Sequence, residues 1–163
     1  MEKVIVIGCP GSGKSTFSKA LAKKIGLPLF HLDLLYWNAN KTTVSKDVFA
    51  DRLDQVLRGS RWIIDGNYAT TLETRIMACD TVFFLDYPLE ICLEGIQTRK
   101  GKPRTDMPWV EKSDETDEEF VDFIKNYNIK CKPKVLSLLK KYSDRNIIIF
   151  RNRIESVEFL ARI

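Results

Sequence analysis

A glycine-rich loop near the start of the chain carries the residue types with the most definite chemistry. Residues 8–16 have the spacing G-x-x-x-x-G-K-[ST], in which glycines let backbone N–H groups converge on an anion without side-chain clashes. Lys14 can reach the β- and γ-phosphates of a nucleoside triphosphate, and the hydroxyl of Ser15 can bind Mg²⁺. We therefore predict ATP and Mg²⁺ as cofactors. The predicted nucleotide-binding residues are Gly8, Cys9, Pro10, Gly11, Ser12, Gly13, Lys14, Ser15 and Thr16.

Three aspartates stand where predicted strands end: Asp33, Asp65 and Asp86. The carboxyl ends of parallel strands meet at one edge of a sheet, where ligands bind, so these side chains are expected to face the phosphates. A carboxylate there can orient Mg²⁺-bound water or accept a proton from a hydroxyl. We predict that Asp33 and Asp65 are catalytic, either of them reaching Mg²⁺ through water, whereas a turn role for Asp86 stays open. His31 shares a strand face with Asp33, either as a second candidate base or as a hydrogen-bonded core residue.

A polar segment at positions 99–112 carries four cations within six residues: Arg99, Lys100, Lys102 and Arg104. A phosphotransfer enzyme needs mobile cations over the γ-phosphate, so this segment is expected to form a short lid. Arg99 and Arg104 would then be catalytic together with Lys14. A solvated loop is the alternative, and the acidic residues that follow are interpreted as exposed charges that complement a helix dipole.

Composition and charge are those of an ordinary globular protein. The chain has 163 residues, of which 44% are hydrophobic and 29% charged, and no apolar run approaches the roughly 20 residues of a membrane span. The first predicted strand begins within three residues, so we expect no signal peptide and no membrane partner. A net charge of +4 and a pI of about 8.8 suit anionic substrates, but the pI stays below the value of about 9 that is typical of nucleic-acid-binding domains.

The four cysteines show neither a close pair nor metal-ligand spacing, and the single histidine cannot complete a zinc site. We therefore expect reduced thiols and a cytoplasmic protein. Cys9 differs from the others because it lies inside the glycine-rich loop, near a helix N-terminus and Lys14. Both neighbours lower the pKa of a thiol, so Cys9 is predicted to be reactive.

Strand-like and helix-like segments alternate along the chain, which is typical of a parallel sheet covered by helices on both faces. Short apolar runs predict strands at positions 3–7, 29–33, 61–65, 81–86 and 146–150. Helical spacing predicts helices from 14 to 25, around 49–57, at 70–78, from 88 onwards, from a capping box at Thr116 onwards, and at 153–162. Pro133 is expected to kink or split the helix that begins near Thr116. The predicted fold class is α/β, a three-layer sandwich with a five-stranded parallel sheet, in one domain spanning residues 1–163.

Five stretches of the sequence occur together and in the same order in a known family. They are the loop at Gly8, residues 31–33 (HLD), 62–68 (WIIDGNY), 84–88 (FLDYP) and 104–107 (RTDM). Over nearly its whole length the chain resembles the bacterial DNA topology modulation proteins, which are similar to adenylate kinase. The resemblance implies a P-loop, nucleotide-kinase-like fold with a short lid and ATP as phosphoryl donor.

The departures from adenylate kinase lie mainly on the acceptor side. Ala69 stands where adenylate kinases carry an arginine that holds the acceptor phosphate, and residues 34–36 supply no second arginine. Gly95 stands in the place of an adenine-packing arginine, whereas Arg99 and Arg104 match arginines that contact donor phosphates. The predicted acceptor-binding residues are Tyr36, Asn67, Tyr68 and Arg75, with Arg75 as the substitute cation.

These features predict an ATP-dependent small-molecule phosphotransferase of the nucleotide-kinase type, whose acceptor is a nucleotide, a nucleoside or a small alcohol. A regulatory nucleotide-binding protein or NTPase that acts on DNA topology is the alternative that the family name suggests. A third possibility is a module that hydrolyses nucleotide slowly and signals by lid closure. We do not expect DNA binding, because the sequence has no recognition-helix signature and its basic cluster lies where the lid is expected.

Overall fold

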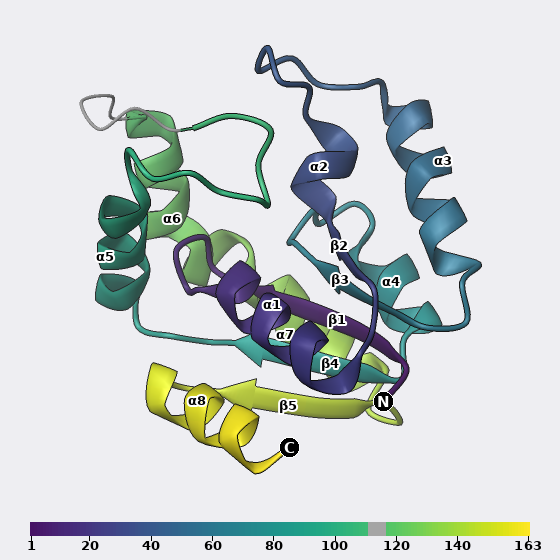
Figure 1. The fold of residues 1–163 in the computed structure, drawn as a ribbon. Coiled ribbons are helices and arrows are strands. Elements are labelled where there is room, and N and C mark those ends of the chain that lie inside the picture. The colour runs from purple at the N-terminus through teal and green to yellow at the C-terminus, as the bar shows by residue number, and fades with distance from the viewer. Residues whose placement is uncertain (111–116) are drawn as a thin grey trace.

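Five short apolar segments form one parallel sheet in the computed structural model, which describes residues 1–110 and 117–163. The strands are β1 (Lys3–Gly8), β2 (Leu29–His31), β3 (Trp62–Asp65), β4 (Thr81–Leu85) and β5 (Asn146–Phe150). Their order is β2-β3-β1-β4-β5, and every neighbouring pair is parallel (Figure 1). The predicted five-stranded parallel sheet is confirmed.

Helices cover both faces of this sheet and make the predicted three layers. They are α1 (Lys14–Ile25), α2 (Leu32–Tyr36), α3 (Lys46–Leu57), α4 (Leu72–Ala78), α5 (Leu89–Arg99), α6 (Glu118–Lys130), α7 (Lys132–Lys141) and α8 (Arg153–Arg162). Successive side chains of a strand point to opposite faces, so Val4 and Val6 join one apolar cluster and Ile5 and Ile7 the other. The first cluster includes residues of α1, α5, α6 and α8, and the second includes residues of α2, α3, α4 and α7 (Figure 1). No helix in the described ranges is long and apolar enough to cross a membrane.

One difference from the sequence-based expectation changes the position of a predicted site residue. The second strand ends at His31 rather than at position 33, and Leu32 begins α2. Leu32, Leu35 and Tyr36 have helical i, i+3, i+4 spacing, and all three pack in the second apolar cluster, which favours a helical turn over an extended strand. Asp33 therefore lies in the first turn of α2 and not at a strand end.

The long helix near the C-terminus is divided in two, as Pro133 predicted. Pro133 occupies the first turn of α7, where its missing N–H has no intrahelical partner to lose. The expected capping residue Thr116 lies outside the described residues. Asp117 caps α6, since its side chain accepts a hydrogen bond of 2.9 Å from the Phe120 amide.

Candidate functional site

The glycine-rich loop joins β1 to α1 at the carboxyl edge of the sheet. Gly11 and Gly13 have φ angles of +84° and +90°, a left-handed conformation that suits glycine and turns successive amides in one direction. A Cβ at Gly11 would lie 1.9 Å from the Cys92 carbonyl oxygen, and one at Gly95 would lie 2.0 Å from the Gly11 carbonyl oxygen. Helix α5 therefore packs directly on the loop, and no side chain fits at position 95 in this arrangement.

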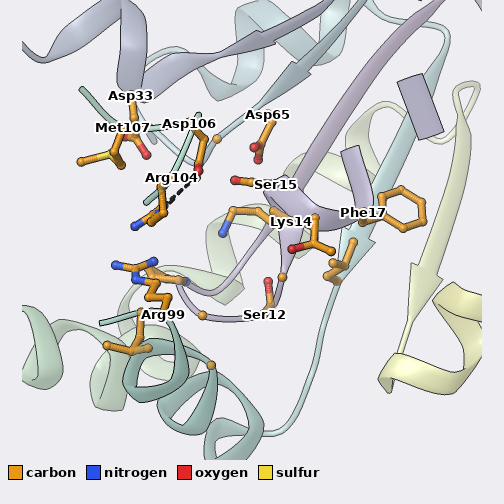
Figure 2. A pocket seen from close by; sticks show the side chains of 18 of the residues that line it. Ser12, Lys14, Ser15, Phe17, Asp33, Asp65, Arg99, Arg104, Asp106 and Met107 are labelled. Atoms are coloured by element: carbon orange, nitrogen blue, oxygen red, sulfur yellow. Dashed lines mark hydrogen bonds and ion pairs between the residues drawn. The ribbon is translucent and has the colours of Figure 1, made fainter. Parts of the chain in front are cut away.

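A cavity of about 1240 Å³ opens above this loop. Helix α2 and the loop after β3 form one wall, and α5, α6 and α8 contribute to the other side (Figure 1). Residues 10–16 line the cavity, whereas Gly8 and Cys9 are not among its lining residues. Figure 2 shows titratable side chains from distant parts of the sequence directed toward one space. The residues that the cavity brings together are Lys14, Ser15, Asp33, Asp65, Asn67, Tyr68, Arg99, Arg104 and Asp106.

Lys14 lies half-buried at the floor of the cavity. Its ammonium group donates a hydrogen bond of 3.1 Å to the Cys9 carbonyl oxygen. Burial lowers the pKa of Lys14, and the charges of Asp65 and Asp33 oppose that shift. A phosphate group beside this ammonium would supply the hydrogen bonds and the opposite charge that stabilise it in place of the water that burial has removed.

Asp33 and Tyr68 form a hydrogen-bonded pair on the wall opposite the loop. The Tyr68 hydroxyl donates to Asp33 Oδ1 over 2.7 Å. Burial raises the pKa of the Asp33 carboxyl, although the Tyr68 hydroxyl counteracts the shift. A carboxylate with a raised pKa that borders a cavity is a stronger proton acceptor than an exposed one. The geometry thus keeps Asp33 as a candidate base even though a helix, and not a strand, positions it.

Asp65 ends β3 and is held from behind by His31. The Nδ1 atom of His31 lies 2.8 Å from Asp65 Oδ2, and Asp65 is only 4% exposed. His31 is not among the residues that line the cavity. Of its two predicted roles, the structure therefore favours the hydrogen-bonded residue, which fixes the orientation of the Asp65 carboxylate. Asn67, two residues further on, accepts a hydrogen bond of 3.2 Å from the Gly8 amide and so ties this loop to the phosphate loop.

Asp106 is a site residue that the sequence reasoning missed. It is 3% exposed and lies 2.5 Å from Arg104 Nη2 and 3.6 Å from Lys19 Nζ (Figure 2). The hydrogen bond from Arg104 and its charge, with a further hydrogen bond from Ser15, hold the pKa of Asp106 far below its usual value despite burial. Its signal was present in the RTDM stretch, because a carboxylate two residues beyond an arginine can pair with that arginine. This ionised side chain links the predicted lid to α1.

The structure overturns the acceptor-binding role expected for Arg75. Its side chain is fully buried, and its guanidinium donates to the backbone carbonyls of Gly66, Asn67 and Tyr68. These carbonyls belong to a loop with left-handed conformations at Gly66 and Tyr68, which neither helix nor sheet can pair. The five donors of an arginine satisfy such a loop, so Arg75 positions Asn67 and Tyr68 and is not directed at the cavity.

Two other predicted residues also lie away from the cavity. The Tyr36 ring packs 5.1 Å from the Tyr68 ring and 5.3 Å from the Phe49 ring, behind the cavity wall. Asp86 is buried in ion pairs with Lys132, at 2.7 Å, and with Arg151. Asp86 therefore joins β4 to α7 and to the loop after β5 through ion pairs, a structural role that differs from the turn role the sequence had left open.

The lid segment is described as far as Val110, and its predicted last two residues, 111 and 112, lie outside the described residues. Arg99 and Arg104 line the cavity, and the Arg99 guanidinium lies 5.6 Å from the centre of the Phe120 ring. At the far end of the segment, the ring of Trp109 meets the ring of Trp37 at 5.3 Å. The described part of the segment thus reaches α6 on one side and the end of α2 on the other.

The expectation that Cys9 is reactive is wrong. Cys9 is 5% exposed and belongs to the apolar cluster beneath the loop. A hydrogen bond with the Cys92 thiol, together with burial, raises the pKa of Cys9, and these effects exceed the lowering by Lys14. Sequence proximity to a lysine and a helix N-terminus did not reveal which way the side chain points.

Alkylation of the native protein is expected to modify Cys131 before the other three cysteines. Cys131 is partly exposed, whereas Cys9, Cys79 and Cys92 are buried. Limited labelling with a maleimide, followed by peptide mass spectrometry, gives the order of reaction, and labelling in urea should modify all four. Faster modification of Cys9 than of Cys131 in the folded protein would contradict this burial.

The comparisons with known proteins show the fold. No family model matches the chain, and no curated protein matches it. Among solved structures, the chain is similar to the 1.7 Å crystal structure of shikimate kinase from Bacteroides thetaiotaomicron, with a TM-score of 0.56 and 18% sequence identity. The match covers 98% of this chain and 94% of that chain. The predicted nucleotide-kinase-like α/β fold with a P-loop is confirmed, whereas the resemblance to topology modulation proteins stays a prediction.

The residues around Ser15 fit Mg²⁺ that arrives with a nucleotide. The Ser15 hydroxyl lies within hydrogen-bonding reach of the Asp106 carboxylate, so hard oxygen donors face the loop. Within the described ranges, no three histidine, cysteine or carboxylate side chains gather as a metal site. Mg²⁺ commonly takes one or two protein ligands together with phosphates and water, which is the donor set available here.

Proposed function

We propose that this protein, acting as a single domain, is an ATP-dependent phosphotransferase that phosphorylates a hydroxyl group of a small molecule. The observation that carries the proposal is the shared cavity, in which the phosphate loop and Lys14 border the same space as the Asp33 carboxylate. A donor site and a proton acceptor on facing walls are the two parts that phosphoryl transfer to a hydroxyl requires.

The donor half would use the loop amides and three cations. Ser12 supports an anion at this place, because its buried hydroxyl has no hydrogen-bond partner among the described residues. Lys14, Arg99 and Arg104 would stabilise the charge on the transferred group. Ser15 would hold Mg²⁺, and the carboxylates of Asp65 and Asp106, which line the same cavity, would orient its water ligands. A bound Mg²⁺ would neutralise charge on the phosphate oxygens.

The acceptor half would use Asp33 as the general base. The acceptor hydroxyl gives its proton to Asp33, and its oxygen forms a bond to the γ-phosphorus. The bond from that phosphorus to the bridging oxygen breaks, and ADP leaves. Asp65 is less suited to this role because it is only 4% exposed and His31 holds its carboxylate, whereas Asp33 is partly exposed. We therefore assign proton transfer to Asp33 and the positioning of metal-bound water to Asp65.

The basic segment supports this function over a direct action on DNA. Arg99 and Arg104 line the cavity, and Arg104 is paired with the buried carboxylate of Asp106. Cations that bind duplex phosphates gather instead on an exposed face, where they can follow the groove.

Acceptor-dependent release of ADP tests the proposal. Purified protein is incubated with Mg²⁺ and ATP, and ADP is measured with and without nucleosides, sugars and small alcohols. We expect one acceptor class to raise ADP release well above the acceptor-free rate. A slow rate that no acceptor changes would instead support a nucleotide hydrolase. Tight, sequence-specific binding of duplex DNA without transfer would support the regulatory alternative.

A further inference from the structure

We propose that the acceptor is an uncharged hydroxyl compound with a planar ring, of the nucleoside class, and not a phosphorylated or carboxylated molecule. The inference rests on the proposed function, and it goes further by naming the chemistry that the acceptor half can recognise. Three observations carry it: the charges on the acceptor wall, the aromatic rings at its outer end, and the environment of Asp33.

Inside the rim of the cavity, the charged side chains that line the acceptor wall are the aspartates Asp33 and Asp65. Asp33 and Asp65 both line the cavity, and Arg75, which follows the loop of this wall in sequence, is buried with its guanidinium on backbone carbonyls. Arg104 is held by Asp106 at 2.5 Å, on the side of the phosphate loop. Lys41 borders the cavity from an exposed turn at its rim. Within residues 1–110 and 117–163, an acceptor phosphate would therefore lie beside two carboxylates with no buried arginine of this wall directed at it, which is unfavourable in a partly desolvated site.

Aromatic rings form the outer part of the same wall. Trp37 and Trp109 line the cavity with their rings 5.3 Å apart, and Tyr68 lines it closer to Asp33. Tyr36 and Phe49 pack against Tyr68 from behind and support it. Trp37 follows α2 and Trp109 belongs to the lid segment, and the two rings meet edge to face at an interplanar angle of 84°, so a ligand ring would stack on one of them and not between them. Flat aromatic surfaces of this kind bind planar rings, and stacking on them does not require charge.

The role of Asp33 also favours an uncharged ligand. A second anion beside Asp33 would raise the pKa of this carboxyl further and favour its protonated form, which cannot accept a proton. An ammonium group would have the opposite effect and would make the carboxylate a weaker base. A neutral hydroxyl compound adds no charge beside Asp33 and therefore does not shift the pKa of this carboxyl in either direction by its charge. Asn67, which also lines the cavity, offers an amide that can hydrogen-bond to such a ligand.

Direct binding measurements test this inference separately from catalysis. Tryptophan fluorescence and thermal unfolding are followed, with ADP and Mg²⁺ present, during titration with adenosine, guanosine or thymidine, with the matching 5′-monophosphates, and with ethanolamine as an amino alcohol. We expect at least one nucleoside to bind at least about tenfold more tightly than its monophosphate and than ethanolamine. Tighter binding of a monophosphate or of ethanolamine would overturn the inference, as would the absence of binding by every nucleoside.

Variants of the aromatic wall separate stacking from a general loss of structure. Trp109→Ala should weaken nucleoside binding by about tenfold and leave the ATP-induced thermal shift unchanged, whereas Trp109→Phe should restore most of the nucleoside affinity. Unchanged nucleoside affinity in Trp109→Ala would contradict the proposed ring site. The proposed function fails in a different way, namely when ATP binds and no acceptor of any class increases ADP release.

Discussion

Replacing Lys14 by alanine is expected to abolish most of the stabilisation that Mg²⁺ and ATP give to this protein. The ammonium group is the one charge within residues 8–16, it would contact the β- and γ-phosphates in the proposed complex, and burial has already removed much of its water. A ligand at a hundredfold excess over its Kd stabilises a protein by about 2.7 kcal/mol, a change that a thermal unfolding curve resolves easily. The melting temperature of Lys14→Ala should therefore hardly respond to ATP, while that of the wild type rises by several degrees.

Lys23 provides the matched control for this experiment. It is an exposed lysine in the last turn of the same helix, so Lys23→Ala removes an equal charge without touching the loop. The Lys23 variant should keep the full ATP response, and both variants should keep the far-ultraviolet circular dichroism of the wild type. A Lys14→Ala protein that responds to ATP as strongly as the wild type would show that the loop does not bind the triphosphate as proposed.

Replacing Asp33 by asparagine is expected to slow phosphoryl transfer by about a hundredfold to ten-thousandfold, the usual contribution of a positioned general base. Asparagine has nearly the same shape and can still accept the hydrogen bond from Tyr68, so ATP binding should not change. Burial raises the pKa of Asp33, and the base acts only when it is deprotonated. The wild-type rate should therefore rise with pH through that raised pKa and then level off, and the variant should lose this rise.

Steady-state rates across a pH series, once an acceptor is known, measure this effect. Asp51→Asn serves as the control, because Asp51 is an exposed carboxylate on α3. Wild-type turnover in Asp33→Asn would remove Asp33 from proton transfer and make Asp65 the remaining candidate. A large loss of the ATP-induced thermal shift in Asp33→Asn would instead indicate a role in binding the donor.

Local patterns predicted the strand segments and the phosphate loop because each of these is formed by residues that are close in sequence. An apolar run such as 81–85 is typical of a strand in a parallel sheet that helices cover on both faces. The loop at residues 8–16 is predictable because its own backbone amides form the anion site. The position of Asp33 was less predictable, because the helical spacing of Leu32, Leu35 and Tyr36 competed with the strand pattern that precedes it.

Side-chain partners that come from distant segments could not be predicted from the sequence. From the sequence, Arg75 was a plausible cation for binding the acceptor. In the structure its guanidinium instead donates to three backbone carbonyls of residues 66–68. Asp106 lies in the site because the lid segment packs close to Ser15 and Lys19 on α1. Tertiary packing determines such contacts, and the periodicity of the sequence does not indicate them.

Transfer of the labelled γ-phosphoryl group tests the central claim most directly. The protein is incubated with Mg²⁺, γ-³²P-labelled ATP and a nucleoside, and the products are separated so that labelled acceptor and labelled inorganic phosphate are counted apart. We predict that the label appears in the acceptor in amounts equal to the ADP formed, and that Lys14→Ala removes this signal. Label that appears only as inorganic phosphate, at the same rate with and without every acceptor tested, would contradict the assignment as a phosphotransferase.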